Sequence, residues 1–455
     1  MSAPAEFNEH PRRILTMCRA LPFTAAILCL TGCSAARQDR PYLDAALQAA
    51  SWIQSVEQST GAGKTWPADP ENPGQVAIDL YAGSAGVVLF FLEAYATTGE
   101  VRFLSDARAG ADDLLARIPE DLGRPDVGLY TGVPGVGFAL LETYQTTRDQ
   151  KYRAGVERIV KLLRTQARKS ADGIEWSDVT DVIGGSAGTG LLLLYVADEL
   201  DAPEARKLAV AAGRRLVQLG QDAERGKKWA MSPGYDRLMP NFSHGTAGVA
   251  YFLTTLYQQT GEQAFLDAAI AGARYLQAVA KTDDDGCLIF HHEPGGEDLF
   301  YLGWCHGPVG TARLFYRLAE VTGDPEWMTW VRKCARSLMT SGIPERRTPG
   351  YWNNVGQCCG AAGVAQFFLD LYRVTGERKY QDFAIRVTAD LLGRATHTDG
   401  GLRWVQAEHR VRPELMVAQT GYMQGAAGIG LLLLHLDAVN NNRQPTIVFP
   451  DTPFE

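Results

Sequence analysis

Three cysteines stand beside two glycine turns of the same kind. Cys305 lies two residues before Gly307 in LGWCHGPVG, and the adjacent pair Cys358 and Cys359 comes directly before Gly360 in NNVGQCCGAAG. Neighbouring cysteines make a poor disulfide because the eight-membered ring distorts its geometry, but both can turn a thiolate toward one metal ion. Three sulfurs at equivalent places of two repeats indicate a tetrahedral soft-metal site with an open fourth position, as in catalytic zinc centres. A buried thiol cluster, or one disulfide with a free thiol, is the alternative.

The turn itself, Gly-x-x-Gly followed by an apolar segment, recurs seven times along the chain. Successive copies begin 49 to 65 residues apart. A recurring period of this kind is the signature of a repeat architecture. The first glycines of the seven turns are Gly83, Gly132, Gly185, Gly245, Gly307, Gly360 and Gly425.

Seven amphipathic segments alternate with the apolar ones. Their apolar residues recur at intervals of three and four, which predicts helices with one buried stripe, whereas runs such as LLLL at 191–194 predict helices buried on all sides. We therefore predict an all-α ring of seven outer and seven inner helices, closed where the first helix meets the last. The N-terminal ends of the inner helices then gather at one end, where their free N–H groups favour thiolates and anions. The predicted outer helices are 41–55, 101–117, 151–168, 202–219, 263–281, 325–339 and 379–394.

The composition is that of a globular protein, with 46% hydrophobic and 21% charged residues. The formal net charge of -8 argues against a nucleic-acid partner. We expect a signal peptide at 1–32, a linker at 33–40, the helical ring at 41–438 and a polar C-terminal tail at 439–455.

The N-terminal residues predict a targeting signal. Arginines within 12–19 precede a short apolar stretch at 21–30, and the following Leu-Thr-Gly-Cys ends at Cys33. This pattern resembles a bacterial lipoprotein signal, in which the chain is cut before the cysteine and lipid is attached to its sulfur. An ordinary secretory signal, or a true start at Met17, is the alternative. We expect an exported protein held to a bacterial membrane through lipid on Cys33, on the periplasmic or cell-surface side.

The seven turns, the WCHG motif at 304–307 and the cysteine pair before the sixth turn together resemble the lanthionine synthetase C-like family, over roughly residues 41–437. The resemblance implies an α/α toroid that binds one zinc ion where the N-terminal ends of the inner helices meet. It implies as ligands the cysteine of a Trp-Cys-x-Gly motif and a Cys-His pair before the next glycine. Carried over residue by residue, these are Cys305, Cys358 and Cys359, with Cys359 in place of the usual histidine.

The resemblance also implies an acid–base pair that faces the zinc. An Asp-Val-Ile segment before the third turn matches Asp181, and a His-Gly before the fourth turn matches His244. Without the resemblance, Asp181 would be a helix cap and His244 a packing residue at a helix start. His306 and Trp304 flank the first cysteine and are candidate substrate contacts or supports for the metal ligands. The family often has an arginine four residues before that cysteine, and this chain has Tyr301 there.

The implied activity is thioether formation. Bound zinc would lower the pKa of a substrate cysteine thiol, and the thiolate would add to the β-carbon of a dehydroalanine or dehydrobutyrine. His244 and Asp181 would handle the proton. The substrate would be a peptide or a small thiol, and a separate dehydratase would have to make the acceptor.

Two other functions stay open. A toroid of this family could bind a peptide or glutathione without catalysis, with zinc structural or absent. An exported carbohydrate-active α/α toroid, such as an unsaturated-uronide hydrolase, would need a carboxylate pair across its cavity. Only Asp181 is predicted to offer a carboxylate from the turns, so this function is the least favoured.

Overall fold

The computed structural model describes residues 39–454 apart from 124–126, 171–172, 348–353 and 410–411. The chain divides into two units, Met1–Asp39 and Arg40–Glu455, and the fold is that of the second unit. The expected signal segment and Cys33 lie outside the described residues. Within the part that the structure describes, no helix is both long and apolar enough to cross a bilayer.

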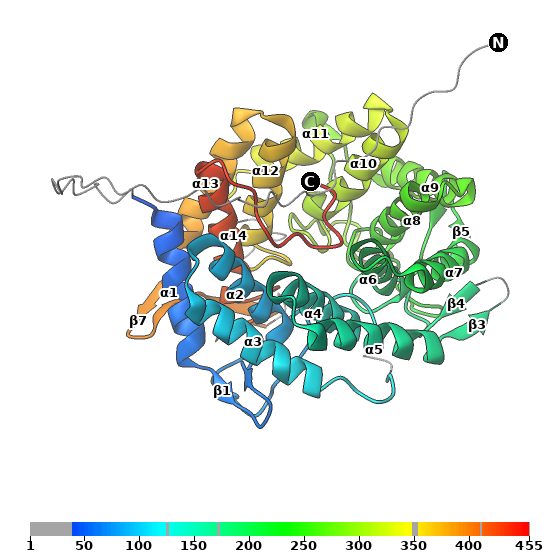
Figure 1. Ribbon diagram of the computed structural model, residues 1–455. Helices are drawn as coiled ribbons and strands as arrows, with labels where there is room; N and C mark the ends of the chain where they lie inside the picture. The colour runs from blue at the N-terminus through cyan, green and yellow to red at the C-terminus, as the bar shows by residue number, and fades with distance from the viewer. Residues whose placement is uncertain (1–38, 124–126, 171–172, 348–353, 410–411, 455) are drawn as a thin grey trace, which may run out of the picture. The chain divides into compact units, whose positions relative to one another are not determined.

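The described residues form fourteen α-helices in two concentric rings (Figure 1). Each inner helix packs against the next, and the last one packs against the first, so the inner ring is closed. Each outer helix packs against the inner helix before it, except α1, which packs against α14. This confirms the predicted all-α toroid. The inner helices are α2 (Ser84–Thr98), α4 (Val133–Thr147), α6 (Ser186–Glu199), α8 (Thr246–Thr260), α10 (Pro308–Thr322), α12 (Ala361–Thr375) and α14 (Ala426–Asn440). The outer helices are α1 (Pro41–Ser55), α3 (Val101–Ala116), α5 (Gln150–Gln166), α7 (Pro203–Leu219), α9 (Gln263–Val279), α11 (Pro325–Thr340) and α13 (Arg378–Gly393).

Burial separates the two rings as the hydrophobic patterns predict. In outer helix α5, Tyr152, Val156 and Ile159 are buried on one stripe while Glu157 on the opposite side is exposed. In inner helix α6, all four leucines at 191–194 are buried. Burying one such side chain stabilises the fold by about 1.5–3 kcal/mol, so the inner ring supplies much of the core.

The glycine turns bring the inner helices together because a side chain there would not fit. A Cβ atom added to Gly245, the N-cap of α8, would lie 1.4 Å from the carbonyl oxygen of Met239. A Cβ atom on Gly248 would lie 2.1 Å from the carbonyl oxygen of Phe242. Both glycines have negative φ, so close approach of the backbone, rather than a left-handed conformation, requires them.

A belt of backbone hydrogen bonds connects the seven repeats just before their turns. In each repeat the belt residue lies two positions before the first glycine of the turn. Six N–H···O bonds of 2.8–3.1 Å join these residues in one continuous series, from the fourth repeat through the seventh and on to the third. The belt therefore holds equivalent positions of neighbouring repeats side by side. The belt residues are Tyr81, Tyr130, Ile183, Ser243, Cys305, Cys358 and Met423.

Short antiparallel hairpins connect several outer helices to the inner helix that follows, and sequence analysis did not predict them. Most of their strands have two or three residues, which is too short to show alternation of polar and apolar residues. They are β1 (Gln58–Ser59) with β2 (Lys64–Thr65), β3 (Arg168–Ser170) with β4 (Gly173–Glu175), β5 (Gln221–Asp222) with β6 (Lys227–Lys228), β7 (Thr396–Thr398) with β8 (Gly401–Arg403), and β9 (Val405–His409) with β10 (Arg412–Ala418).

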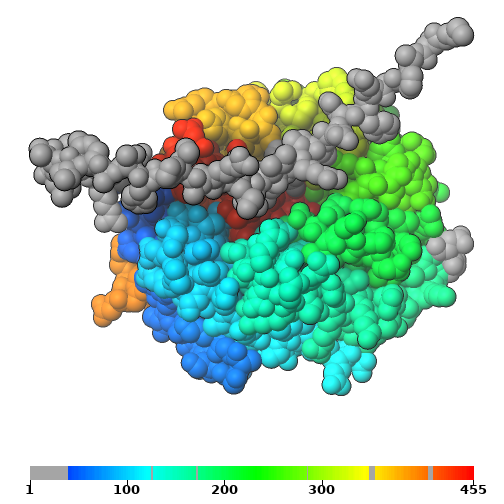
Figure 2. All heavy atoms as spheres, in the orientation of Figure 1, coloured from blue at the N-terminus to red at the C-terminus, as the bar shows by residue number. Residues whose placement is uncertain are grey.

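The C-terminal residues do not form the polar tail expected at 439–455. Helix α14 ends at Asn440, and the chain then returns to the centre of the ring, where Ile447, Phe449 and Phe454 are buried. Red atoms from this end of the chain are visible toward the middle of the face seen in Figure 2. The difference arises because only the first residues after α14 are polar, whereas PTIVFPDTPF carries apolar side chains that the ring interior buries. We name residues 443–454 the C-terminal plug.

Candidate functional site

Three thiols meet where the inner helices begin. The Sγ atoms of Cys305 and Cys359 are 2.9 Å apart, and those of Cys359 and Cys358 are 3.3 Å apart. The three sulfur atoms all lie within 4.8 Å of one another, close enough to bind one metal ion. No other group of three histidine, cysteine or acidic side chains among the described residues is arranged in this way. Tetrahedral zinc with Zn–S bonds near 2.3 Å separates its sulfurs by about 3.8 Å. The cluster fits such an ion after shifts of about 1 Å.

The belt explains why these cysteines meet. Cys305 and Cys358 are belt residues of neighbouring repeats, and the N–H of Cys305 donates to the carbonyl oxygen of Cys358 (3.1 Å). Cys359 is the next residue and lies against Gly303, where an added Cβ atom would be 2.7 Å from its Cα. Equivalent placement in two repeats, inferred from the sequence, therefore becomes direct contact in the fold.

The thiols share charge unevenly. Hydrogen bonds from the Cys305 and Cys359 thiols hold the pKa of Cys358 well below its usual value. Burial raises the pKa of Cys305 well above its usual value, and its hydrogen bond to Cys358 acts in the same direction. Without a metal, these contacts favour the thiolate form at Cys358 over Cys305, and a thiolate is a ready ligand for a soft cation.

Asp181 and His244 lie beside this cluster and bond to each other. Asp181 Oδ2 is 2.7 Å from His244 Nδ1, and Asp181 Oδ1 accepts the N–H of Gly184 (2.8 Å). Burial lowers the pKa of His244, whereas the charge and the hydrogen bond of Asp181 raise it. The effect of Asp181 is the larger, so the pKa of His244 lies above its usual value. Because the carboxylate accepts a hydrogen bond from Nδ1–H and so keeps that proton on Nδ1, Nε2 is left to exchange a proton with a substrate. Ser243, the neighbour of His244, donates its N–H to the carbonyl oxygen of Cys305 (3.0 Å).

The other three sequence candidates lie at different depths. His306 is buried, its Nδ1 has no hydrogen-bond partner among the described residues, and its ring centroid is 5.6 Å from that of His244. Burial lowers the pKa of His306 well below its usual value, so it is neutral at pH 7. Trp304 is buried in the interior and donates its Nε1–H to Asp451 (3.1 Å), so it supports the site from inside. Tyr301 is half-buried, and its ring lies 4.8 Å from that of His291.

Three residues near the cluster were not predicted from the sequence as functional. Tyr81 is the belt residue of the first repeat and hydrogen-bonds to Cys358, which helps to lower the pKa of that thiol. Tyr81 lies two residues before the first glycine of its turn, as Cys305 does, and this shared position could have predicted it. The ring of His291 lies 4.0 Å from that of His306, and its Nδ1 is 2.8 Å from Nδ1 of His292. The loop that carries this histidine pair has no repeat or periodic pattern that could have placed it.

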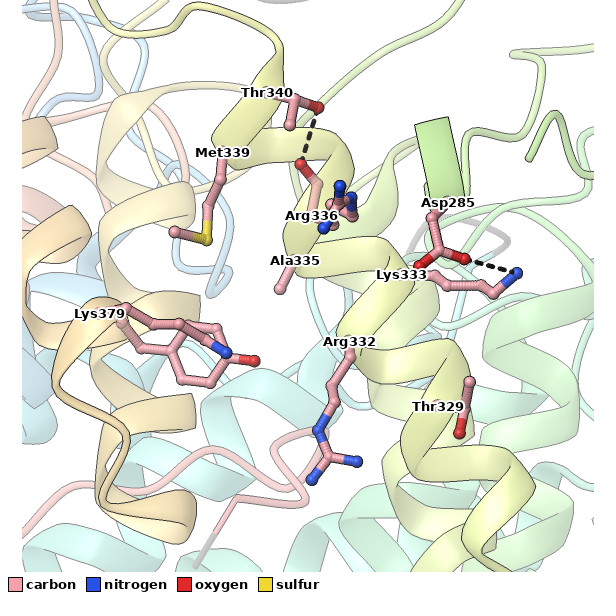
Figure 3. A pocket seen from close by; sticks show the side chains of 10 residues that line it. Asp285, Thr329, Arg332, Lys333, Ala335, Arg336, Met339, Thr340 and Lys379 are labelled. Atoms are coloured by element: carbon pink, nitrogen blue, oxygen red, sulfur yellow. Dashed lines mark hydrogen bonds and ion pairs between the residues drawn. The ribbon is translucent and has the colours of Figure 1, made fainter. Parts of the chain in front are cut away.

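A separate groove of about 460 Å³ lies between outer helices α11 and α13 (Figure 3). Arg332, Lys333 and Lys379 line it, and Lys333 Nζ is 3.5 Å from Asp285. No cysteine or histidine is among the described residues that line it. The groove therefore lacks the acid–base and metal-binding groups of the cysteine site.

Comparisons with known proteins identify the family and the fold of this chain. Residues 74–451 match the sequence profile of the family described as Lanthionine synthetase C-like protein. The structure of nisin cyclase is similar with a TM-score of 0.62 and 15% identity, over 89% of this chain and 95% of that one. An inactive variant of the alpha-1,6-mannanase of Salegentibacter sp. HEL1_6, in complex with alpha-1,6-mannotetrose, is similar with a TM-score of 0.50 and 16% identity, over 87% of this chain and 98% of that one. These structural likenesses show a shared fold, and the profile match, which spans most of the residues, shows that this chain belongs to the lanthionine synthetase C-like family.

Proposed function

We propose that this protein is a zinc-dependent enzyme of the lanthionine-cyclase type, which adds a cysteine thiolate to a dehydroamino acid and so forms a thioether. The observation that carries the proposal is the meeting of three thiols with an Asp181–His244 pair. Family membership and the nisin cyclase fold support the same reaction class.

Cys305, Cys358 and Cys359 would hold the zinc ion. When bound, zinc supplies Lewis acidity, which makes a substrate thiol acidic enough to be a thiolate near neutral pH. The three protein thiolates would bring a charge of about -3 against the +2 of zinc, so the ion would withdraw less charge from a substrate thiolate. We expect it to be a better nucleophile, and to leave more easily, than at a site with a histidine ligand.

The protein groups would manage one proton in each turnover. Nε2 of His244 takes the proton of the substrate thiol, while Asp181 stabilises the imidazolium through Nδ1–H. The sulfur then forms a bond to the β-carbon of the dehydroamino acid, whose double-bond electrons move toward the carbonyl to give an enolate. His244 returns the proton to the α-carbon, so the reaction is an isomerisation of the peptide with no change in mass.

The partners follow from this chemistry. The substrate would be a peptide that carries both a cysteine and a dehydroamino acid, made by a separate dehydratase, or a small thiol paired with a similar electrophile. We further propose that the protein acts after export, held to the membrane by lipid on Cys33.

The first test is metal content. Residues 34–455, purified without added zinc, should contain about one zinc per chain, and Cys305→Ala, Cys358→Ala and Cys359→Ala should each lose it. Cys334→Ala is the matched control, because Cys334 is equally buried but lies on α11 outside the cluster. A metal-free wild type with Cys358 or Cys359 in a disulfide would contradict the proposal. Loss of free thiol without change in mass, in a peptide with cysteine and dehydroalanine, tests the reaction itself.

Non-catalytic binding and carbohydrate cleavage are the remaining alternatives. A glycosidase uses two carboxyl groups on either side of the bond it cleaves. Here the Asp181 carboxylate is engaged by His244 and Gly184, and its neighbours are thiols and imidazoles. The likeness to the mannanase therefore extends to the fold and does not favour its chemistry. Zinc content without thiol turnover would favour the binding function.

A further inference from the structure

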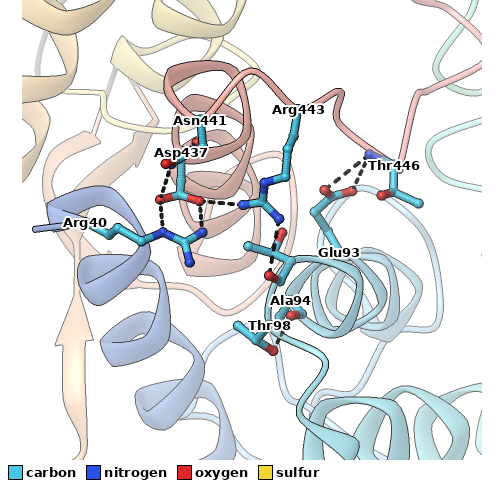
Figure 4. A network of polar contacts seen from close by, with 9 residues as sticks. Arg40, Glu93, Ala94, Thr98, Asp437, Asn441, Arg443 and Thr446 are labelled. Atoms are coloured by element: carbon cyan, nitrogen blue, oxygen red, sulfur yellow. Dashed lines mark hydrogen bonds and ion pairs between the residues drawn. The ribbon is translucent and has the colours of Figure 1, made fainter. Parts of the chain in front are cut away.

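The C-terminal plug is held in the ring by specific contacts. Glu93 on α2 accepts the backbone N–H of Thr446 (3.0 Å) and of the residue after it (2.7 Å), and the first of these contacts is drawn in Figure 4. The ring of Phe449 stacks on that of Tyr422, with centroids 4.3 Å apart. Such contacts fix the course of the segment through the centre of the toroid.

One carboxylate of the plug is fully buried and reaches other repeats. Asp451 accepts from the hydroxyl of Tyr130 (3.0 Å), from Nε1–H of Trp304 (3.1 Å) and from Nη1–H of Arg313 (3.1 Å). Nη1 of Arg313 also donates to the carbonyl oxygen of Asp451 (2.7 Å). A buried carboxylate is tolerated only when it is paired and hydrogen-bonded, and these donors satisfy it.

The contact with Trp304 lies one residue from the metal cluster. The indole is 3% exposed and packs between Tyr130 (centroids 4.9 Å apart) and Phe242 (5.6 Å). Its Nε1–H bond to Asp451 fixes the rotation of the ring within this packing. The backbone of Trp304 continues directly into Cys305, which the belt joins to Cys358.

We propose that Asp451 is a positioning residue of the metal centre, which acts through Trp304 to hold Cys305 in register with the other two cysteines. The inference rests on the proposed zinc site. Without the carboxylate, the indole loses its fixed rotation and Cys305 samples positions outside the reach of a shared ion. The C-terminal plug is thus a part of the metal site, although none of its residues is a ligand.

The test uses the full-length protein with Asp451→Asn and Trp304→Phe. The second variant keeps an aromatic ring and the Asp451–Arg313 pair but removes the Nε1–H donor, so it remains informative if Asp451→Asn fails to fold. Zinc affinity is measured by competition with a chelator, and the site geometry by the visible absorption of the cobalt(II) form. We expect zinc affinity to fall by about tenfold or more in both variants, with a changed cobalt spectrum.

Asp106→Asn is the matched control. Asp106 on outer helix α3 is also a buried carboxylate, but it accepts from Gln54 (2.6 Å) and Lys64 (2.7 Å), which lie outside the C-terminal plug. This control should lower thermal stability without changing the cobalt spectrum. If wild type binds zinc and both test variants bind it equally well, or if the control weakens binding as much, the inference is wrong and the zinc site stands. If wild type binds no metal, the proposed function fails, and the inference with it.

Discussion

At the scale of residues, two aspartates at the same turn position act differently. Asp79 and Asp181 each lie four residues before the first glycine of their turns, so the expectation that only Asp181 offers a carboxylate from the turns is wrong. Asp79 Oδ1 accepts the N–H groups of Ala82 (2.8 Å) and Gly83 (3.3 Å) and serves the turn alone. Asp181 uses one oxygen for its turn and the other for His244. The same local role thus leaves the second carboxylate oxygen available, and of these two aspartates only Asp181 uses it to bond a histidine, His244 of the fourth repeat.

Replacing Asp181 by Asn should lower the pKa of His244, because the charge that raises it is lost. A histidine with a raised pKa in the folded state adds stability that is fully present below its unfolded pKa, about 6.5, and is lost as the pH rises through the folded pKa. Asp181→Asn should therefore reduce the free energy of unfolding by about 1.5–3 kcal/mol near pH 6, and by less at pH 9. Urea denaturation across this pH range measures the difference.

Asp79→Asn is the control for the cap alone, because Asp79 Oδ1 bonds the N–H groups of its own turn, and it should leave the pKa of His244 unchanged. A proton NMR titration of His244 gives the pKa directly. An unchanged pKa in Asp181→Asn would show that the pair does not interact in solution as its 2.7 Å contact indicates.

At the scale of elements, the turns place every inner helix by the same device. In six of the seven turns the carbonyl oxygen six residues before the second glycine lies within 2.4 Å of an added Cβ atom, as at Gly248, and in the first turn it lies 3.1 Å away. The helices can therefore converge tightly enough for the belt bonds to form.

Gly248→Ala should be strongly destabilising, by about 3 kcal/mol or more, because the new methyl group would overlap a backbone oxygen. Gly393→Ala is the matched control, since Gly393 ends α13 with nothing within 4 Å of an added Cβ atom. The control should be neutral or stabilising by up to about 1 kcal/mol. Thermal unfolding of the two variants compares them, and equal melting temperatures would contradict the steric role of the turn.

The sequence predicted those parts of the molecule that repeat. The outer helices begin and end within about two residues of the predicted bounds, because the spacing of apolar residues and the glycine turns mark them. The meeting of Cys305 with Cys358 was predictable for the same reason, as both precede equivalent turns. The plug was not, because Asp451 finds Tyr130 and Trp304 far along the chain, and no local pattern records such contacts. The histidines near His306 were missed because they lie on an irregular loop.

At the scale of the whole molecule, one ion-pair network joins the two ends of the ring. Arg40 at the start of α1 donates to Asp437 on α14 (Nε to Oδ1, 2.9 Å), and Arg443 donates to the same carboxylate (2.9 Å), as Figure 4 shows. Asp437 is buried, whereas Arg40 is partly exposed. The network therefore couples ring closure to the entry of the C-terminal plug.

Replacing Asp437 by Asn should lower the free energy of unfolding by about 2–3 kcal/mol. This is at or below the low end of the cost of breaking a fully buried ion pair, because Arg40 is partly solvated. Unfolding should stay a single transition, since a closed ring has no terminal repeat that can fray alone. Urea titration followed by circular dichroism measures both quantities. A separate early transition would show that the ring opens at the α1–α14 contact before the rest unfolds.

Ring closure also has a consequence in time. Of the fourteen helices that the structure describes, α1 is the first to leave the ribosome and its partner α14 is the last. At about 5–20 residues per second, roughly 20–80 s separate their synthesis. Throughout that interval the apolar stripe of α1, with Leu43, Trp52 and Ile53, has no native partner to cover it. The nascent chain therefore depends on a chaperone, or on transient burial of this stripe against other parts of the chain, until α14 is made.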